Sequence, residues 1–335
     1  MKNVALALAI FVFLAFCVML TAQIMVSVDL PQTGQELKGD HRFDFAALAP
    51  IGTTPLPTIQ NFTARDNSLL GYRLYRSGMP THIKLYLVHS AAWQAMEFNQ
   101  IASRLATERG VADVYLADMR GHGSGPARRG DVDYVGQLED DLADLISETA
   151  GPGDLVVVGG HGEGAAVAMQ FALDKPQAVH GCLVLAPVLS YNLSGNKPDL
   201  GGWTHALGTR MVGLWILNGM GLHWSDHETV LQYALPSTLR DGPLGYSATT
   251  DISWRMYHAL QMRDRDGRDV GNLAMPLLSI IGGGDEVVDA EAMTAMLKSR
   301  LPNGQYWINP AETHINVVVS NKTLAIIQDW LSELH

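Results

Sequence analysis

From residue 83 onward, short apolar runs alternate with amphipathic segments, and this alternation restricts the possible folds more than any other feature. Runs of this kind are typical of buried strands, and the segments between them follow the 3.6-residue period of a helix. The predicted strands are 83–89, 111–118, 154–160, 181–187, 276–282 and 305–309, and the predicted helices lie within 94–108, 134–149, 163–173, 290–300 and the segment after 309. Strands that alternate with helices predict an α/β fold, with a mostly parallel sheet and helices on both faces.

The interval from about 188 to 272 interrupts this alternation, and we expect it to form an inserted helical lid. It holds four of the seven tryptophans, and its stretch 208–224 is too rich in Leu, Met and Trp for a solvated loop. We expect Trp203, Trp215 and Trp224 to line an apolar substrate cavity beside the sheet. Each tryptophan taken singly fits an ordinary helical core equally well.

Residues 1–26 predict a membrane anchor. Val4 to Leu20 is a run of 17 residues without a charge, and a helix needs about 17 to 25 apolar residues to cross a bilayer. A cleavable signal peptide has a shorter apolar core, of about 7 to 15 residues, and small residues at its cleavage site. We therefore favour an uncleaved single-pass anchor over a secreted chain. Lys2 precedes the run, which predicts that the remaining chain lies on the exported side, periplasmic or extracellular.

Residues 27–58 are interpreted as a juxtamembrane tether, because four prolines between positions 31 and 57 interrupt any sustained periodicity. Residues 59–335 are then left for a single globular domain that contains the lid. A domain of this length buries a large fraction of its surface on folding, which is enough to form a large core.

The charge balance argues against a nucleic-acid partner. The chain has 23 Lys and Arg against 34 Asp and Glu, a formal charge of −11, which is the wrong sign for phosphate backbones. Cys17 and Cys182 are too few for a disulfide framework or a cysteine zinc site. The segment HWSDHE at 223–228 contains possible ligands, but we interpret it as a polar turn and expect no metal and no cofactor.

The third predicted strand ends in GHGEG at 160–164 and passes directly into a helix. This strand, sharp turn and helix with small flanking residues resemble the nucleophile elbow G-x-S-x-G, here with Gly162 in place of the serine. Other motifs follow other strands, namely HSA at 89–91, DMRGHGS at 118–124, GGGDEVV at 282–288 and ETH at 312–314. Together they resemble the α/β-hydrolase fold superfamily over about residues 59 to 335. The nearest resemblance is to lysophospholipase and monoacylglycerol-lipase-like hydrolases of the serine aminopeptidase S33 type.

The resemblance implies a catalytic acid at Asp285 and a catalytic histidine at His314, and it places Gly162 at the nucleophile position. An imidazole accepts the proton of a hydroxyl nucleophile, and a carboxylate fixes the tautomer of that imidazole. The backbone N–H groups of Ala91 and Glu163 are the implied oxyanion hole. We expect the side chain of Glu163 to point away from the substrate.

Glycine at position 162 cannot form an acyl-enzyme. We therefore expect a scaffold for hydrolysis of carboxylic esters, lipid-like or otherwise small, that is inactive or strongly impaired. Ser90 departs from the family's His-Gly pair, and its hydroxyl is not expected to face His314. The glycine fits a natural pseudoenzyme and a substitution made to trap substrate equally well.

Two other functions stay open. A pseudo-hydrolase would serve as a ligand-binding subunit, or as an interaction subunit beside an unidentified membrane partner. An aminopeptidase of the S33 type would need carboxylates in the lid to hold a substrate amine, and the candidates there are Asp226, Glu228 and Asp251.

Overall fold

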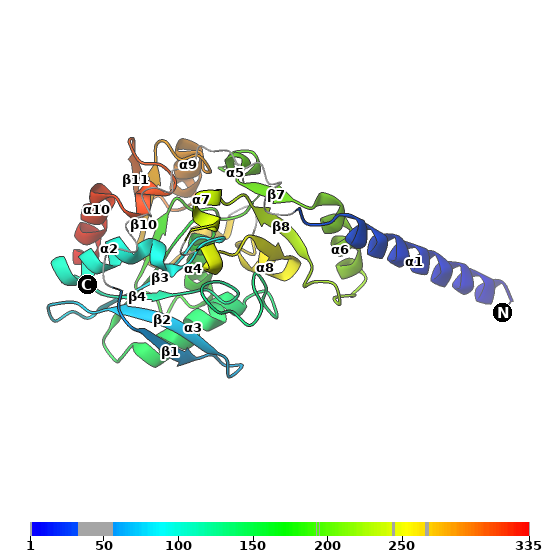
Figure 1. The fold of residues 1–335 in the computed structure, drawn as a ribbon, viewed down its shortest axis with the longest axis horizontal. Coiled ribbons are helices and arrows are strands. Elements are labelled where there is room, and N and C mark those ends of the chain that lie inside the picture. Colours follow the sequence, from blue (N-terminus) through cyan, green and yellow to red (C-terminus); the bar gives the residue numbers. More distant parts are fainter. Residues whose placement is uncertain are drawn as a thin grey trace.

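The computed structural model describes residues 2–32, 56–191, 193, 195–242, 245–264 and 268–334. Its first element is the helix α1, Lys2–Val28, which projects away from a single rounded domain (Figure 1). The expected tether falls largely on residues 33–55, which lie outside the described residues. The first residues assigned to that tether instead continue α1.

A sheet of eight strands forms the centre of the domain, in the order β1-β2-β4-β3-β5-β6-β10-β11. The strands are β1 Ile59–Thr63, β2 Leu69–Tyr75, β3 Ile83–Val88, β4 Asp113–Ala117, β5 Leu155–His161, β6 Gly181–Leu185, β10 Leu277–Gly282 and β11 Gln305–Asn309. β2 is antiparallel to β1 and β4, and every pair from β4 to β11 is parallel. The mostly parallel sheet is confirmed, and each of the predicted strands is present within two residues of its predicted bounds.

Helices cover both faces of this sheet (Figure 1). Successive strand residues point to opposite faces, and every residue of β6 and β10 is buried, so neither face is open there. The covering helices are η2 Ala95–Phe98, α2 Asn99–Ser103, η3 Arg104–Glu108, α3 Gln137–Thr149, α4 Glu163–Asp174, α9 Ala290–Arg300, η6 Asn316–Val318 and α10 Asn321–Ser332. The core is therefore the sheet with its two helical layers, as the alternation predicts.

The insertion at 188–272, called the lid below, is helical only in part. Its helices are α5 Asp199–Gly202, α6 Gly208–Gly219, α7 Ser237–Arg240, η4 Gly245–Ser247, α8 Trp254–Ala259 and η5 Arg268–Asn272. It also contains a small antiparallel sheet of β7 Thr204–Ala206, β8 Thr229–Tyr233 and β9 Asp251–Ser253. This sheet was not predicted, because two of its strands have only three residues, too few to show a period, and the lid lacks the alternation of the main sheet.

The lid is joined to α1 (Figure 1). Ala22 and Val26, near the end of α1, are buried. Gly213 of α6 lies so close to α1 that a Cβ there would be 2.6 Å from the carbonyl oxygen of Ala22. The Arg210 guanidinium donates to the carbonyl oxygen of Val26 at 2.9 Å. The end of α1 is thus part of the packed lid.

Candidate active site

Gly162 lies between β5 and α4, at the carboxyl edge of the sheet. Its backbone has φ +56° and ψ −125°, a conformation that glycine adopts readily and that costs other residues about 1–3 kcal/mol. Gly164 permits a close approach between α4 and β3, because a Cβ there would lie 2.2 Å from the carbonyl oxygen of Val88. The strand, turn and helix of an elbow are therefore present, without a side chain at the centre.

Asp285 follows β10 and His314 follows β11, and the two side chains meet. His314 Nδ1 lies 2.9 Å from Asp285 Oδ2 and 3.1 Å from Oδ1. Asp285 Oδ1 also accepts the backbone N–H groups of Val287 and Val288, at 2.8 and 2.7 Å. Both members of the pair are buried. The carboxylate is thus held by the backbone and in turn holds the imidazole.

The environment of His314 favours its protonated form. Burial disfavours a charged imidazole and by itself lowers the pKa of His314. The charge and hydrogen bond of Asp285, helped by the charges of Glu163 and Glu286, outweigh burial and hold that pKa above its ordinary value. The neighbouring carboxylates therefore stabilise the imidazolium that forms when His314 accepts a proton.

The imidazole faces the position of the missing side chain. A Cβ placed on Gly162 would lie 3.7 Å from His314 Nε2 and 3.1 Å from the Cβ of Ser90. The first distance allows a hydroxyl on that carbon to reach Nε2 by a hydrogen bond. The second is shorter than the usual contact between carbon atoms, about 3.5–4.0 Å. Ser90 therefore crowds the position that a nucleophile would need.

The side chain of Glu163 points into the site, contrary to expectation. Its Oε2 accepts the backbone N–H of Ala91 at 3.3 Å, and its Oε1 accepts the hydroxyl of Tyr233 at 2.8 Å. The residue is only 4% exposed. A carboxylate thus occupies one of the two expected oxyanion donors. Sequence reasoning could not foresee this, because Tyr233 belongs to β8 of the lid, 70 residues further along the chain.

Glu97 is a buried residue of the site that sequence analysis missed. It accepts the Ser90 hydroxyl at 2.7 Å and the Ser90 backbone N–H at 2.9 Å, so this hydroxyl is turned to Glu97 and not to His314. His161 Nδ1 lies 3.2 Å from the same carboxylate. Burial tends to raise the pKa of Glu97, but His161 and the Ser90 hydrogen bond outweigh it and hold the pKa below its ordinary value. Nothing in the amphipathic segment that contains Glu97 distinguishes it from a surface residue.

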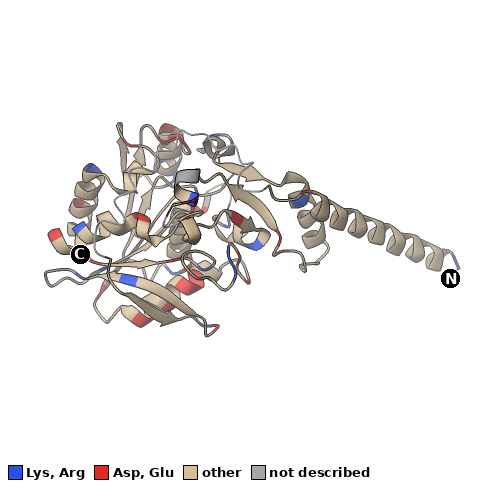
Figure 2. Cartoon of the chain, in the orientation of Figure 1, with Lys and Arg blue, Asp and Glu red and all other residues tan. Residues whose placement is uncertain are grey.

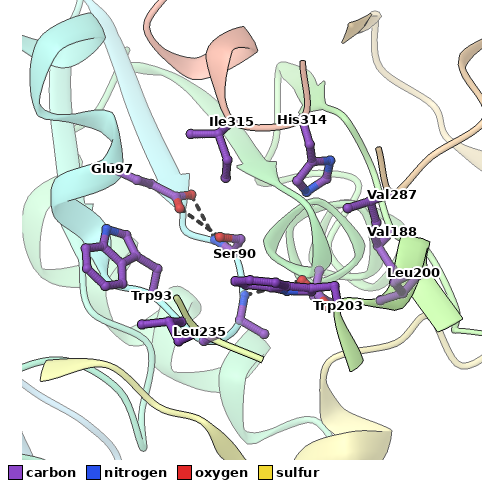
Figure 3. A pocket seen from close by; sticks show the side chains of 13 residues that line it. Ser90, Trp93, Glu97, Val188, Leu200, Trp203, Leu235, Val287, His314 and Ile315 are labelled. Carbon is purple, nitrogen blue, oxygen red and sulfur yellow. Dashed lines mark hydrogen bonds between the residues drawn. The ribbon is translucent and has the colours of Figure 1, made fainter. Parts of the chain in front are cut away.

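A small cavity lies above these groups (Figure 3). Ser90, Glu163 and His314 contribute polar groups to its wall, and Trp203 and Leu235 of the lid cover it. Its volume is about 20 Å³, which is room for about one water molecule. In this conformation the lid therefore closes over the site and leaves no space for an ester.

Trp203 is the one of the three proposed substrate-binding tryptophans that lines this cavity. Trp215 and Trp224 do not line it, and they are 71% and 54% exposed. The Trp224 indole N–H donates to Gln23 of α1 at 2.9 Å. Both residues thus lie away from this cavity. A high count of aromatic residues in a segment does not indicate which of its sides faces the sheet.

Residues 80–305 match the family of hydrolases described as serine aminopeptidase, S33. The match covers more than half of the chain. The chain belongs to the S33 hydrolase family. No curated protein matches the chain in sequence.

Solved structures show the same fold. A soluble variant of monoglyceride lipase from Saccharomyces cerevisiae, in complex with a substrate analog, has a TM-score of 0.66 at 15% identity, over 84% of this chain and 96% of that chain. A monoacylglycerol lipase from Paleococcus ferrophilus has a TM-score of 0.59 at 19% identity, over 79% and 99%. A proposed aryl esterase from Burkholderia cenocepacia has a TM-score of 0.59 at 18% identity, over 82% and 98%. At these identities the likeness shows that the chain has the α/β-hydrolase fold.

Two further histidines of this S33 hydrolase hold loops together. His89 Nε2 accepts the backbone N–H of Met119 at 2.9 Å. Burial, together with His89, lowers the pKa of His122 to about 3, so this ring stays neutral. His122 packs edge-on against His89. Both therefore fix the turn at 118–124 beneath the site, and neither faces the cavity.

Three carboxylates of the S33 lid, those considered for an aminopeptidase, are bonded to neighbouring side chains. Asp226 accepts from Asn218 at 2.6 Å, and Asp251 accepts from Gln232 at 2.6 Å. Glu228 pairs with Arg210 at 3.2 Å. Within the described residues, no three His, Cys, Asp or Glu side chains form a candidate metal group. The segment at 223–228 is a turn in which His223 lies 3.0 Å from Asp226.

Proposed function

We propose that the protein is a membrane-anchored hydrolase of lipid-like or small acyl esters, with His314 as general base and Asp285 as the group that orients it. The observation that carries the proposal is the buried pair of these residues, joined at 2.9 Å. The free nitrogen of that imidazole faces Gly162, at 3.7 Å from its would-be Cβ. Proton transfer needs this geometry first and a suitable pKa second.

Water takes the place of the serine in this mechanism. A water molecule beside Gly162 attacks the ester carbonyl carbon while His314 Nε2 accepts its proton. The tetrahedral intermediate then collapses, the bond to the alkoxide breaks, and the imidazolium returns the proton to the leaving oxygen. The products are the free acid and the alcohol. In a serine hydrolase that lacks its triad, binding and oxyanion contacts alone still raise the reaction rate about 10³–10⁴-fold over that in water. Turnover by this mechanism is therefore slow.

Glu163 has to move for this reaction. Its carboxylate accepts the Ala91 N–H that would stabilise the oxyanion, and two negative charges in a site of low dielectric repel each other strongly. Opening of the lid would take Tyr233 away from Glu163 and release the side chain. The closed cavity of about 20 Å³ likewise requires the lid to open before an ester binds.

The membrane part of the proposal rests on α1. From Asn3 to Val28 this helix has no charged residue, and its length and composition suit a membrane span. A cleaved signal peptide would take α1 away from the lid, and with it the contacts of Ala22 and Val26. Retention of α1 is therefore the better interpretation. Lys2 on the N-terminal side favours a domain on the exported side.

A ligand-binding pseudo-hydrolase is the second candidate. It is favoured by the carboxylate of Glu163 in the expected oxyanion hole and by the closed lid. The aminopeptidase alternative is weaker, because the carboxylates named for it, Asp226, Glu228 and Asp251, are engaged by other side chains and do not line the cavity.

The test compares the full chain with His314→Ala, both in detergent, on p-nitrophenyl esters of increasing acyl length and on monoacylglycerols. We expect slow hydrolysis by the full chain and a loss of at least about tenfold in the variant, because general-base catalysis contributes about 10²–10⁴-fold. Equal rates in the two proteins would rule out the hydrolase. If a non-hydrolysable ether analogue nevertheless raised the melting temperature of the unmodified chain, the pseudo-hydrolase would be the better reading.

A further inference from the structure

The helix α1 is longer than a membrane is thick. Its 27 residues, at 1.5 Å each, extend about 40 Å, against about 30 Å for the hydrocarbon core of a bilayer. About seven residues must therefore project beyond the core. The buried residues of α1, Ala22 and Val26, lie at the end nearest the domain. The bilayer boundary thus falls close to the point where the lid meets α1.

The lid helix α6 runs back along α1 toward the membrane. At its start, the Thr209 N–H donates to Asp29 at 2.9 Å, just beyond the end of α1. Midway along α6, Gly213 packs against Ala22. After α6, the indole of Trp224 donates to Gln23. The segment 211–224 therefore lies at the level of residues 22 and 23 of α1, beside the expected boundary.

This segment exposes an apolar surface, called the lid patch below and made of Val212, Trp215, Met220 and Trp224. Their exposed fractions are 48%, 71%, 40% and 54%. The stretch from 211 to 224 contains no Lys, Arg, Asp or Glu, and Figure 2 shows the same lack of charge along α1. Tryptophan prefers the interface between lipid and water, where its ring is in contact with apolar chains and its N–H with polar groups.

We propose that the lid patch lies in the interface of the bilayer that α1 crosses, so that the lid is held on the lipid surface. This rests on the membrane-spanning role given to α1 under the proposed function. The patch is continuous with α1 through the Gly213 and Trp224 contacts, so a bilayer that surrounds α1 reaches it without any movement of the domain. The apolar area enters the boundary between headgroups and acyl chains, as in other surface-bound helices.

The charges near the lid patch indicate which lipid headgroups are sufficient for its binding. Arg210, the cation nearest the patch on α6, is buried and paired with Glu228, and Asp29 adds a negative charge at the same end of the helix. Binding through anionic headgroups needs clusters of exposed Lys and Arg, which the segment 211–224 lacks. The attachment is therefore apolar, and zwitterionic phosphatidylcholine is enough.

The lid patch also links the membrane to the cavity. Trp203, which covers the cavity, precedes α6 by five residues in the same continuous segment, α5-β7-α6. Lipid that contacts α6 therefore lies beside the part of the lid that covers the cavity. An acyl ester that leaves the bilayer beside α6 meets the lid before it meets water.

The test measures tryptophan fluorescence of the full chain reconstituted in phosphatidylcholine vesicles, with lipids brominated at a shallow position of the acyl chain as quenchers. We expect quenching in the unmodified chain, a smaller quenched fraction in Trp215→Phe and in Trp224→Phe, and almost none in the double variant. Trp307→Phe is the matched control, because Trp307 is 44% exposed on β11 and its removal should leave the intensity lost to the quencher unchanged. Added salt or phosphatidylglycerol should not alter the result.

Resistance of the protein to extraction by alkaline carbonate separates the two proposals. A protein that is extracted has no membrane span, and both the anchor and the lid patch then fail. A protein that resists extraction but shows no quenching, or no loss in the Trp215 and Trp224 variants, keeps its anchor and overturns the lid patch. If a second copy of the chain covered the patch, the protein would resist extraction without being quenched. A Trp215→Cys variant that lacks Cys17 would then form disulfide-linked dimers.

Discussion

Two regions meet at one edge of the sheet, namely the loops after β10 and β11 and the turn after β5. They differ in the side chains that they contribute to the site. The first two loops hold a buried Asp285–His314 pair, and backbone N–H groups satisfy the carboxylate. The turn has no side chain at Gly162, and the neighbouring residues Ser90 and Glu163 crowd the vacant position and occupy an oxyanion donor. The proposed acid and base are placed for proton transfer, whereas position 162 carries no attacking group.

This difference teaches that an Asp–His pair can be retained either for catalysis or for stability. Removing one partner of a buried ion pair costs about 3–5 kcal/mol, because the other charge is left uncompensated. A nucleophile in a strained turn gives no such stability, and replacing it with glycine relieves about 1–3 kcal/mol of strain. The presence of Asp285 and His314 is thus compatible with slow catalysis and with a structural role, and the following measurements separate the two.

The largest effect is expected from exchanging the residues at positions 90 and 162. The double variant Ser90→Gly/Gly162→Ser places a hydroxyl opposite His314 and removes the Cβ that crowds it at 3.1 Å. We expect ester hydrolysis to rise by up to about 10⁶-fold, the factor that loss of the serine costs in a serine hydrolase. A fluorophosphonate probe with peptide mapping should label the introduced serine. A folded double variant that is neither labelled nor faster would show that the acid–base pair is structural.

The next effect tests Asp285 in that double variant. Adding Asp285→Asn should lower kcat by roughly 10³–10⁴-fold, because the amide no longer fixes the required tautomer of His314. The amide has the same shape as the carboxylate that lies 2.9 Å from His314, so the variant should keep the position of the imidazole. Circular dichroism serves as the check of folding. A fall of less than tenfold would remove Asp285 from the proposed mechanism.

Glu163 should set the pH dependence of the same double variant. A protonated imidazole cannot accept a proton, so activity falls as the pH drops through the pKa of His314, which is raised. The charge of Glu163 is one cause of that rise. Glu163→Gln should therefore lower the pKa of His314 and move the acidic limb of the pH–rate profile to lower pH. An unchanged limb, or one displaced to higher pH, would contradict this role of Glu163.

The smallest effect concerns stability. Gly162→Ser alone should lower the free energy of unfolding by about 1–3 kcal/mol, since a side chain at φ +56° is strained and also meets Ser90. Urea denaturation measures the change. Ser90→Gly in addition relieves the crowding but removes the hydrogen bond from the Ser90 hydroxyl to Glu97, so the double variant should not be more stable than the unmodified chain. Greater stability of Gly162→Ser than of the unmodified chain would show that the turn carries no strain.

The parallel part of the fold was predictable from the sequence because its apolar strands alternate with amphipathic helices, and most of these strands are followed by a motif. The positions of Asp285 and His314 followed from the same order. The orientation of Glu163 was not predictable, because it depends on the hydroxyl of Tyr233, which lies in the lid, where the alternation of strands and helices is interrupted. The exposure of Trp215 depends likewise on where α1 lies, which no local pattern indicates.

The packing of α6 on α1 has a consequence for biosynthesis. Arg210 and the carbonyl group of Val26 that it binds are 184 residues apart. At about 5–20 residues per second, the ribosome takes roughly 10–40 s to make that interval. Throughout that time the domain-side end of α1 lacks its contacts with the lid. The first helix to leave the ribosome thus waits for the lid to complete these contacts, and in the proposed anchored protein the lid packs on a helix that is already in the membrane.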